Sequence, residues 1–122
     1  FIEPSLYHTK MPNWILPAKY NDDMFSSIKS AIIRPGIGTV TDCINYSVPM
    51  FCFYEKQNNE MRFNAENIEK KGIGINSKTI EIAWDQCNLS YKSSDRKYFQ
   101  MDLFSRINLK GAQDFVEIIL KN

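Results

Sequence analysis

A run of five apolar residues at positions 50–54 (Met-Phe-Cys-Phe-Tyr) constrains the fold of this chain more than any other stretch. A short run without polar alternation is typical of a strand that is buried on both faces of a parallel sheet. Segments with a helical pattern flank it, and shorter apolar runs lie beyond them at residues 31–33 and 72–75. Short strands that alternate with helices predict an α/β fold with a parallel sheet and right-handed crossovers.

The spacing of apolar residues, with the cap and stop signals between them, predicts the remaining elements. The expected strands are residues 14–17, 31–33, 50–54 and 72–75. The expected helices are residues 22–30, 39–47, 60–71, 80–91, 98–107 and 110–121, with a polar loop at 92–97. Residues 80–84 also alternate like a strand, so a strand remains the alternative to the helix there.

Four of the expected helices carry an apolar face that we expect to be buried. Helix 39–47 has the face Val40, Cys43 and Ile44. Helix 60–71 has the face Met61, Ala65 and Ile68. Helix 80–91 has the face Ile80, Trp84, Cys87 and Tyr91. Helix 110–121 has the face Ala112, Phe115, Val116 and Ile119. We expect Thr39 to cap the first of these helices, and Gly72 stands where a glycine often ends a helix.

The size and charge of the chain limit its class. Its 122 residues make one domain or part of one. The net charge of +1 gives no reason to expect a nucleic-acid partner. No apolar run approaches the roughly 20 residues of a membrane-spanning helix, so we expect no membrane span. The chain opens with Phe-Ile-Glu-Pro, which suggests an excised or partial domain.

The cysteines and the histidine favour no metal or redox chemistry. Cys43, Cys52 and Cys87 are odd in number and contain no Cys-x-x-Cys pair, which predicts reduced thiols and a cytoplasmic protein. His8 has no Ser, Cys or Asp at a recognisable spacing, so we expect a surface or structural histidine. No cluster has metal-ligand spacing, and we expect neither a metal nor a cofactor.

Residues 34–42 (Arg-Pro-Gly-Ile-Gly-Thr-Val-Thr-Asp) join an expected strand to an expected helix. Such a junction can cradle a phosphate, because glycines allow close approach and a helix N-terminus favours negative charge. The alternative is an ordinary turn that uses its glycines to change direction. The stretch lacks the Gly-Lys-Ser/Thr of a Walker loop and the third glycine of a dinucleotide fingerprint.

A second polar stretch, residues 57–60 (Gln-Asn-Asn-Glu), follows the strand at 50–54. Its amides and carboxylate could hydrogen-bond sugar hydroxyls at the carboxyl end of that strand. The alternative is a solvated turn with a helix cap.

Four motifs, taken in order, resemble a known family. They are residues 34–42, 47–50 (Ser-Val-Pro-Met), 60–65 (Glu-x-x-x-Asn-Ala) and 71–74 (Lys-Gly-Ile-Gly). Their spacing resembles the nucleotide-sugar-binding domain of GT-B-fold glycosyltransferases, in the branch of the UDP-glycosyltransferases and the cell-wall GlcNAc transferase. The resemblance covers residues 14–76, about half of the chain, and residues 108–112 are similar to the closing helix of that domain.

The resemblance implies roles for particular residues. The diphosphate-binding residues would be Arg34, Gly36, Ile37, Gly38 and Thr39. Asp42 would hold the ribose hydroxyls, and Asn59 and Glu60 would contact the donor sugar. Asn64 would cap and orient the helix that follows it.

Three positions depart from the family pattern. Asp42 stands where the family usually has Glu, Met61 where it has Gln, and Ser47 where it has Gly. The resemblance assigns no catalytic residue to this chain, because the family's acceptor site and catalytic base lie in a separate N-terminal domain.

By this resemblance, residues 1–122 form a single, partial domain: a Rossmann-like three-layer parallel sheet, the distal part of a GT-B C-terminal domain. It would bind a UDP-sugar donor for transfer of the sugar to an acceptor hydroxyl, and the isolated chain would be inactive. Its partners would be the donor and the missing N-terminal acceptor domain. The alternatives are a nucleotide-sugar epimerase or hydrolase of the same fold, and a non-catalytic interaction domain whose exposed sheet edge forms a homodimer.

Overall fold

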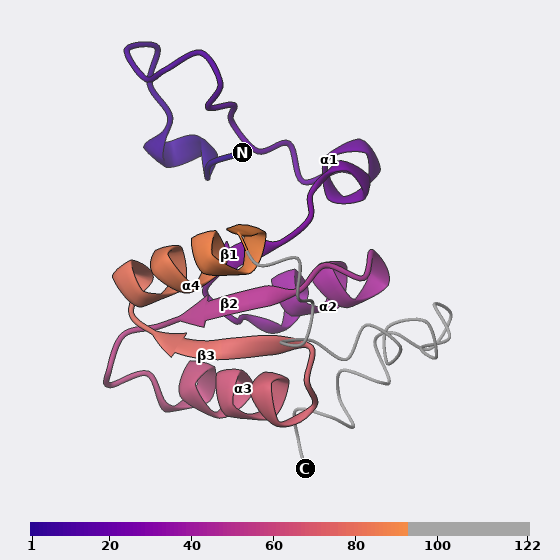
Figure 1. Ribbon diagram of the computed structural model, residues 1–122, viewed down its shortest axis with the longest axis vertical. Coiled ribbons are helices and arrows are strands. Elements are labelled where there is room, and N and C mark those ends of the chain that lie inside the picture. The colour runs from indigo at the N-terminus through magenta and orange to yellow at the C-terminus, as the bar shows by residue number, and fades with distance from the viewer. Residues whose placement is uncertain (93–122) are drawn as a thin grey trace.

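The computed structural model describes residues 1–92, and the segment from 93 onward is drawn as a grey trace in Figure 1. The helices are η1 (Pro4–Leu6, a 3₁₀ helix), α1 (Asp22–Ser27), α2 (Ile37–Asn45), α3 (Asn59–Lys70) and α4 (Ile80–Lys92). The strands are β1 (Ala31–Ile33), β2 (Met50–Phe53) and β3 (Gly74–Lys78). The helices expected at 98–107 and 110–121 lie outside the described residues, as does almost all of the loop at 92–97.

The three strands form one parallel sheet in the order β1-β2-β3. Ala31 pairs with Met50, and Met50 pairs with Gly74 on its other side. The central position of β2 explains its uninterrupted apolar sequence, because a strand between two neighbours and two helix layers meets no water. The predicted α/β class and parallel sheet are confirmed.

Helices cover both faces of the sheet. Met50 and Cys52 point to the face on which α2 and α3 pack, in one buried cluster with residues of both helices. Phe51 points the other way, and α4 crosses that face over all three strands. A partly buried hydrogen bond from Ser77 to Gln86, with 2.5 Å between the oxygens, connects β3 to α4.

The main core lies between the sheet, α2 and α3. Its buried members are Val40, Cys43, Ile44, Val48, Met50, Cys52, Ala65, Ile68 and Ile73. The apolar face predicted for α2 is therefore confirmed, as is that of α3 at Ala65 and Ile68, whereas Met61 is only half-buried. Gly74 is required at the start of β3, because a Cβ there would lie 2.5 Å from the Met50 carbonyl oxygen.

Residues 14–17 do not form the expected strand. Within the described residues, this segment makes only an isolated bridge between Ile2 and Pro17, and Trp14 is 71% exposed. Pro17 has no N–H to donate, so its bridge with Ile2 does not extend into a strand. Figure 1 shows that this N-terminal segment extends away from the sheet, beyond α1 and α4.

Other element ends also differ from the prediction. Helix α2 ends at Asn45 rather than at residue 47, and Ser47 has a left-handed φ of 56°. Helix α1 ends at Ser27 rather than at residue 30, because the Ser26 and Ser27 hydroxyls bond carbonyls of their own helix and Ile28 is extended. Strand β3 begins at Gly74 rather than at residue 72, because Gly72 is the left-handed residue that ends α3, with a φ of 74°.

Residues 80–92 form a helix, as predicted, but a different face is buried. Ala83 is completely buried, while Ile80 and Trp84 are at least half exposed. A small side chain at position 83 lets α4 lie close to the sheet over Phe51, which is also buried. The Tyr91 side chain lies outside the described part of the chain.

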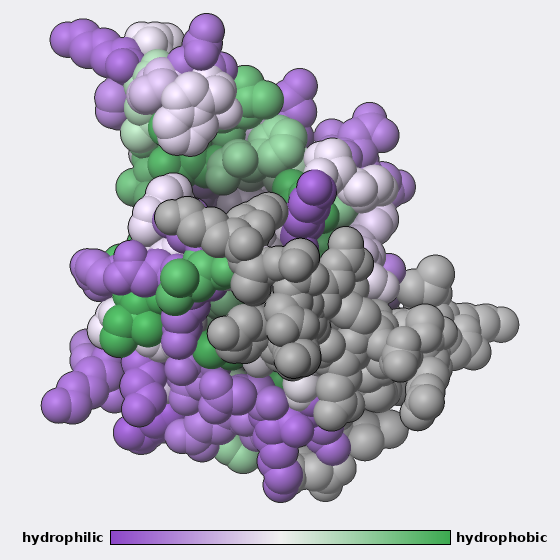
Figure 2. Space-filling view, viewed as in Figure 1, coloured by the Kyte–Doolittle hydropathy of each residue, from purple (hydrophilic) through white to green (hydrophobic). Residues whose placement is uncertain are grey.

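No helix within residues 1–92 is long and apolar enough to cross a bilayer. Figure 2 shows apolar residues gathered on the surface of the N-terminal segment and beside α4. The most exposed of the large apolar side chains are Phe1, Leu6, Trp14, Tyr20, Trp84 and Leu89.

Candidate functional site

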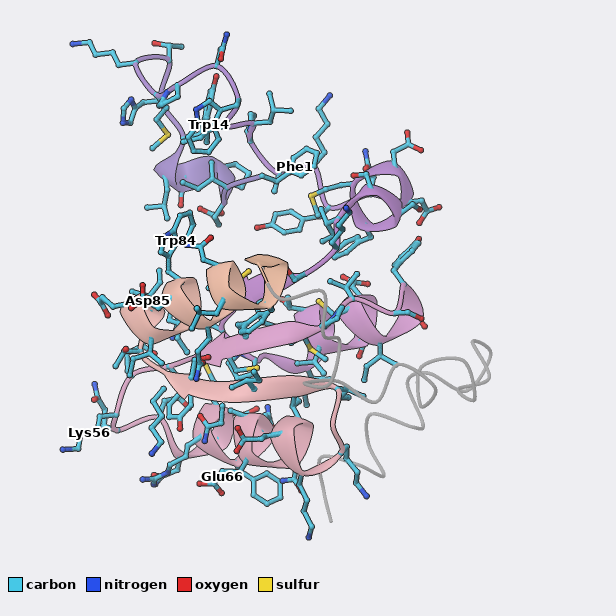
Figure 3. The ribbon with its side chains drawn as sticks, in the orientation of Figure 1. Phe1, Trp14, Lys56, Glu66, Trp84 and Asp85 are labelled. Carbon is cyan, nitrogen blue, oxygen red and sulfur yellow. The ribbon has the colours of Figure 1, made fainter. Side chains whose placement is uncertain are left out.

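The carboxyl edge of the sheet carries one cationic residue at the end of each strand. Arg34 follows β1, Lys56 comes three residues after β2, and Lys78 is the last residue of β3. Figure 3 shows Lys56 beyond the strand ends. Ligands of parallel α/β sheets bind at this edge, where the three cations lie beside the carboxylates of Glu55 and Glu60.

The junction between β1 and α2 is short and tightly held. Pro35 is buried, and the Gly36 N–H donates to the Arg34 carbonyl at 2.8 Å. The Gly36 carbonyl then accepts the Val40 N–H at 2.9 Å, which makes Gly36 the N-cap of α2.

Thr39 is therefore not the helix cap that the sequence predicted. The helix begins two residues earlier, at Ile37, because the Gly36 carbonyl already accepts the first helical hydrogen bond. No side chain among the described residues caps α2. The N–H groups of Ile37, Gly38 and Thr39 open the first turn, where the helix itself offers them no acceptor.

Gly36 and Gly38 are not required by the fold. A Cβ on either residue would meet no atom within 4 Å. Gly36 has a φ of −74°, and Gly72 is the single described glycine with a left-handed φ. Glycine is a common N-cap, so only Gly38, inside the first turn, costs the helix up to about 1 kcal/mol relative to alanine. These two glycines therefore leave open space over the first turn of α2 that neither packing nor backbone geometry demands.

Arg34 is engaged by a residue that the sequence analysis missed. Its Nη2 atom lies 2.6 Å from Oε2 of Glu55, and both side chains are about half exposed. A hydrogen bond to its own backbone has the largest effect on Glu55 and lowers the pKa of its carboxyl; desolvation opposes this, and Arg34 lowers the pKa further. The signal in the sequence was the position of Glu55, an acid directly after the apolar run of β2 and level with Arg34.

Asp42 lies on α2, one turn beyond Gly38 and about 6 Å further along the helix axis. Its side chain is half-buried, and desolvation raises the pKa of its carboxyl above the ordinary value. Residues four apart share a helix face, so Asp42 and Gly38 lie along the same side of α2.

Asn59 and Glu60 are the first two residues of α3, at the carboxyl edge, and both are exposed. The cap of α3 is the preceding residue, Asn58, whose Oδ1 accepts the Met61 N–H at 3.1 Å. Asn59 accepts a hydrogen bond from Arg62 of its own helix. The fold thus brings both predicted sugar-binding residues to the edge that carries Arg34.

Asn64 has a different place from the one expected. It lies inside α3 and caps no helix; it is buried, and its Nδ2 donates to the Pro35 carbonyl at 2.8 Å. The bond joins α3 to the β1–α2 junction across 29 positions of sequence.

The other candidates offer no second site. Within residues 1–92, no three His, Cys, Asp or Glu side chains gather as metal ligands would. All three cysteines are free thiols, and His8 is exposed. Burial raises the pKa of Cys43 to about 12, so its thiol stays protonated at neutral pH.

Comparison of the chain with models of protein families, with curated proteins and with solved structures finds no match.

Proposed function

We propose that the first turn of α2 binds the diphosphate of a nucleotide-sugar, and that the chain is the donor-binding part of a glycosyltransferase. Arg34 and the N–H groups of Ile37, Gly38 and Thr39 contact the diphosphate in this proposal. Asp42 holds the ribose, and Asn59 and Glu60 contact the sugar. Cations and helix N–H groups at this position stabilise the negative charge that builds on a diphosphate leaving group.

One observation carries the proposal: Gly36 and Gly38 open a space over the start of α2 that the fold does not need. A bound phosphate would need this space, because its oxygens must come within hydrogen-bond distance of backbone N–H groups. Arg34, Lys56 and Lys78 at the same edge offer cationic groups to a phosphate, although Glu55 competes for Arg34.

The remaining parts of the proposal rest on the family resemblance and on composition. The sugar goes to an acceptor hydroxyl bound by a separate N-terminal domain, and the base of the donor is uracil. The protein is cytoplasmic, in keeping with its three free thiols.

Titration of the ¹⁵N-labelled chain with UDP tests the proposal. We expect saturable shifts of the Gly36, Ile37, Gly38 and Thr39 amides, and no response from the β3–α4 side of the sheet at Ala83. Inorganic phosphate and uridine, each alone, should bind more weakly than UDP. An unchanged spectrum at millimolar UDP, with the fold intact, contradicts the proposal.

A non-catalytic interaction domain is the second candidate, and the apolar side chains exposed on α4 favour it. Ile80, Trp84 and Leu89 are each at least half exposed. The UDP titration separates the two candidates, because an interaction domain gives no shift. Product analysis distinguishes a glycosyltransferase from an epimerase or hydrolase of the same fold. An epimerase or hydrolase converts a UDP-sugar without any acceptor.

A further inference from the structure

Asn64 is an unusual residue at its position. It lies in the middle of α3 and is 3% exposed, although asparagine is a weak helix former and a buried amide is unfavourable unless it is hydrogen-bonded. Its partner is the Pro35 carbonyl, at 2.8 Å. The side chain therefore contributes a connection between two elements rather than helix stability.

This bond fixes the peptide plane between Pro35 and Gly36. In a trans peptide the carbonyl and the N–H point in opposite directions. Asn64 holds the carbonyl at one end of the plane, and the Arg34 carbonyl accepts the Gly36 N–H at the other end, at 2.8 Å. The plane cannot rotate without breaking both bonds.

The next peptide begins α2, so the direction of the helix start follows from this plane. The Gly36 carbonyl accepts the Val40 N–H, and the buried ring of Pro35 fixes its own φ. The open N–H groups of Ile37, Gly38 and Thr39 come directly afterwards. Their orientation is set before any ligand arrives.

A second buried asparagine on the same helix serves as a comparison. Asn67 is 8% exposed and donates to the Phe63 carbonyl of its own helix at 2.9 Å. It lies one turn from Asn64, with similar burial and the same chemistry. Its bond stays within α3, however, so it fixes nothing at the carboxyl edge.

We propose that Asn64 is the positioning residue of the anion site, which holds the β1–α2 junction in its binding geometry. This inference rests on the proposed function. A site whose donors are fixed in advance loses less conformational freedom when it binds, and the gain appears as affinity. Asn64 acts through the backbone and does not touch the ligand.

The experiment compares Asn64→Leu with Asn67→Leu, two changes that remove a buried donor from one helix. Hydrogen exchange is measured by NMR on the free chain, well below the unfolding temperature of each variant. In Asn64→Leu we expect the Gly36 and Val40 amides to exchange at least tenfold faster, with the Tyr46 amide at the other end of α2 unchanged. In Asn67→Leu all three amides should keep their wild-type rates.

Binding of UDP is then measured on the same proteins. We expect Asn64→Leu to bind at least tenfold more weakly than wild type, and Asn67→Leu to stay within twofold. If wild type binds UDP and Asn64→Leu binds equally well, the positioning role is wrong while the proposed function stands. If wild type itself does not bind UDP, the proposed function is wrong, and the exchange rates alone decide whether Asn64 holds the junction.

Asn64→Asp provides a second test, which also serves if Asn64→Leu does not fold. The carboxylate cannot donate to the Pro35 carbonyl, but the protonated acid can. The affinity of this variant relative to wild type, measured at each pH, should therefore rise as the pH falls from 7.5 to 5. The ratio cancels the titration of the UDP phosphate. A ratio that is low at pH 7.5 and does not rise on acidification as far as the folded state persists overturns the inference.

Discussion

The Arg34 guanidinium and the Glu55 carboxylate lie 2.6 Å apart, and each belongs to the first residues after a strand of the sheet. Glu55 thus forms an ion pair with Arg34, which precedes the first turn of α2 and its unpaired N–H groups. An anion that reaches Arg34 must exchange with Glu55 or share the guanidinium with it. The pair carries no net charge, so at the proposed site Glu55 would compete with phosphate for Arg34.

Replacing Glu55 with Gln should strengthen UDP binding about three- to tenfold, because it removes a competing negative charge beside the site. Isothermal titration of both proteins at low ionic strength measures the change, and added salt should reduce it. The matched control is Glu66→Gln, a charge-equivalent change at an exposed position within α3. Weaker binding by Glu55→Gln contradicts this account, since Glu55 would then orient Arg34 for the ligand.

The Glu55 carboxylate, which its own backbone hydrogen-bonds first of all and which Arg34 also contacts, gives the stability of the fold a pH dependence. The folded-state pKa of Glu55 lies below its ordinary value of 4.5, so its stabilising contribution is present above that pH. It is lost as the pH falls through the lowered pKa. We therefore expect wild type to be slightly more stable than Glu55→Gln near pH 7, with the difference disappearing in strong acid. Urea unfolding at several pH values measures it, and a difference that grows in acid has the wrong sign.

Gly38→Ala should separate binding from stability. Alanine raises the free energy of unfolding by up to about 1 kcal/mol, because Gly38 is helical and its Cβ position is empty. UDP binding should weaken, since the new methyl group enters the space in which we propose that the phosphate binds. Thermal unfolding with and without UDP measures both effects.

Gly74→Ala is the control for this change. Its Cβ collides with the Met50 carbonyl, so the variant should lose about 1–3 kcal/mol of stability as an overpacked core does. Increased stability with unchanged UDP affinity in Gly38→Ala would show that the glycine serves no ligand.

Replacing Asp42 with Asn tests the proposed ribose contact. Desolvation raises the folded-state pKa of Asp42 above 3.8, so its charged form is less favourable in the folded chain. Asp42→Asn should stabilise the fold slightly at pH 7, by less than about 0.5 kcal/mol because the side chain is partly exposed, and not at all at pH 3. UDP affinity should fall several-fold, whereas the affinity for inorganic phosphate should not change.

The control for this variant is Asp85→Asn, on the exposed side of α4 (Figure 3), which should alter neither stability nor binding. Equal loss of phosphate and UDP affinity in Asp42→Asn contradicts a ribose contact.

Local signals in the sequence were sufficient for the sheet and for the helices that pack on it. The continuous apolar run is buried from Met50 to Cys52, and the periodic Val40 face of α2 is buried too, so pattern and structure agree. The pattern failed on α4, where Trp84 and Ile80 are exposed and the small Ala83 is buried. Hydrophobicity alone does not reveal how closely a helix approaches a sheet.

Some parts of the candidate site could likewise be predicted from local sequence, and others could not. The loop at Gly36 and the carboxyl-edge position of Glu60 follow from chain order, which the sequence contains. The contacts of Arg34 with Glu55 and of Asn64 with Pro35 join residues 21 and 29 positions apart. Such long-range pairs depend on the register of neighbouring elements, which no local pattern in a single sequence determines.

The three thiols should differ sharply in reactivity. Cys43 and Cys52 are completely buried, and burial raises the pKa of Cys43 to about 12, whereas Cys87 is half-buried beside Ser30. At pH 8 a thiol with that pKa is ionised in about one molecule in ten thousand, and the thiolate is the form that reacts. We expect a disulfide reagent such as DTNB to modify only Cys87 in the folded chain and all three thiols in urea. Cys87→Ser should then leave no fast-reacting thiol, and rapid modification of Cys43 in the folded protein would contradict the packing of α2 against the sheet.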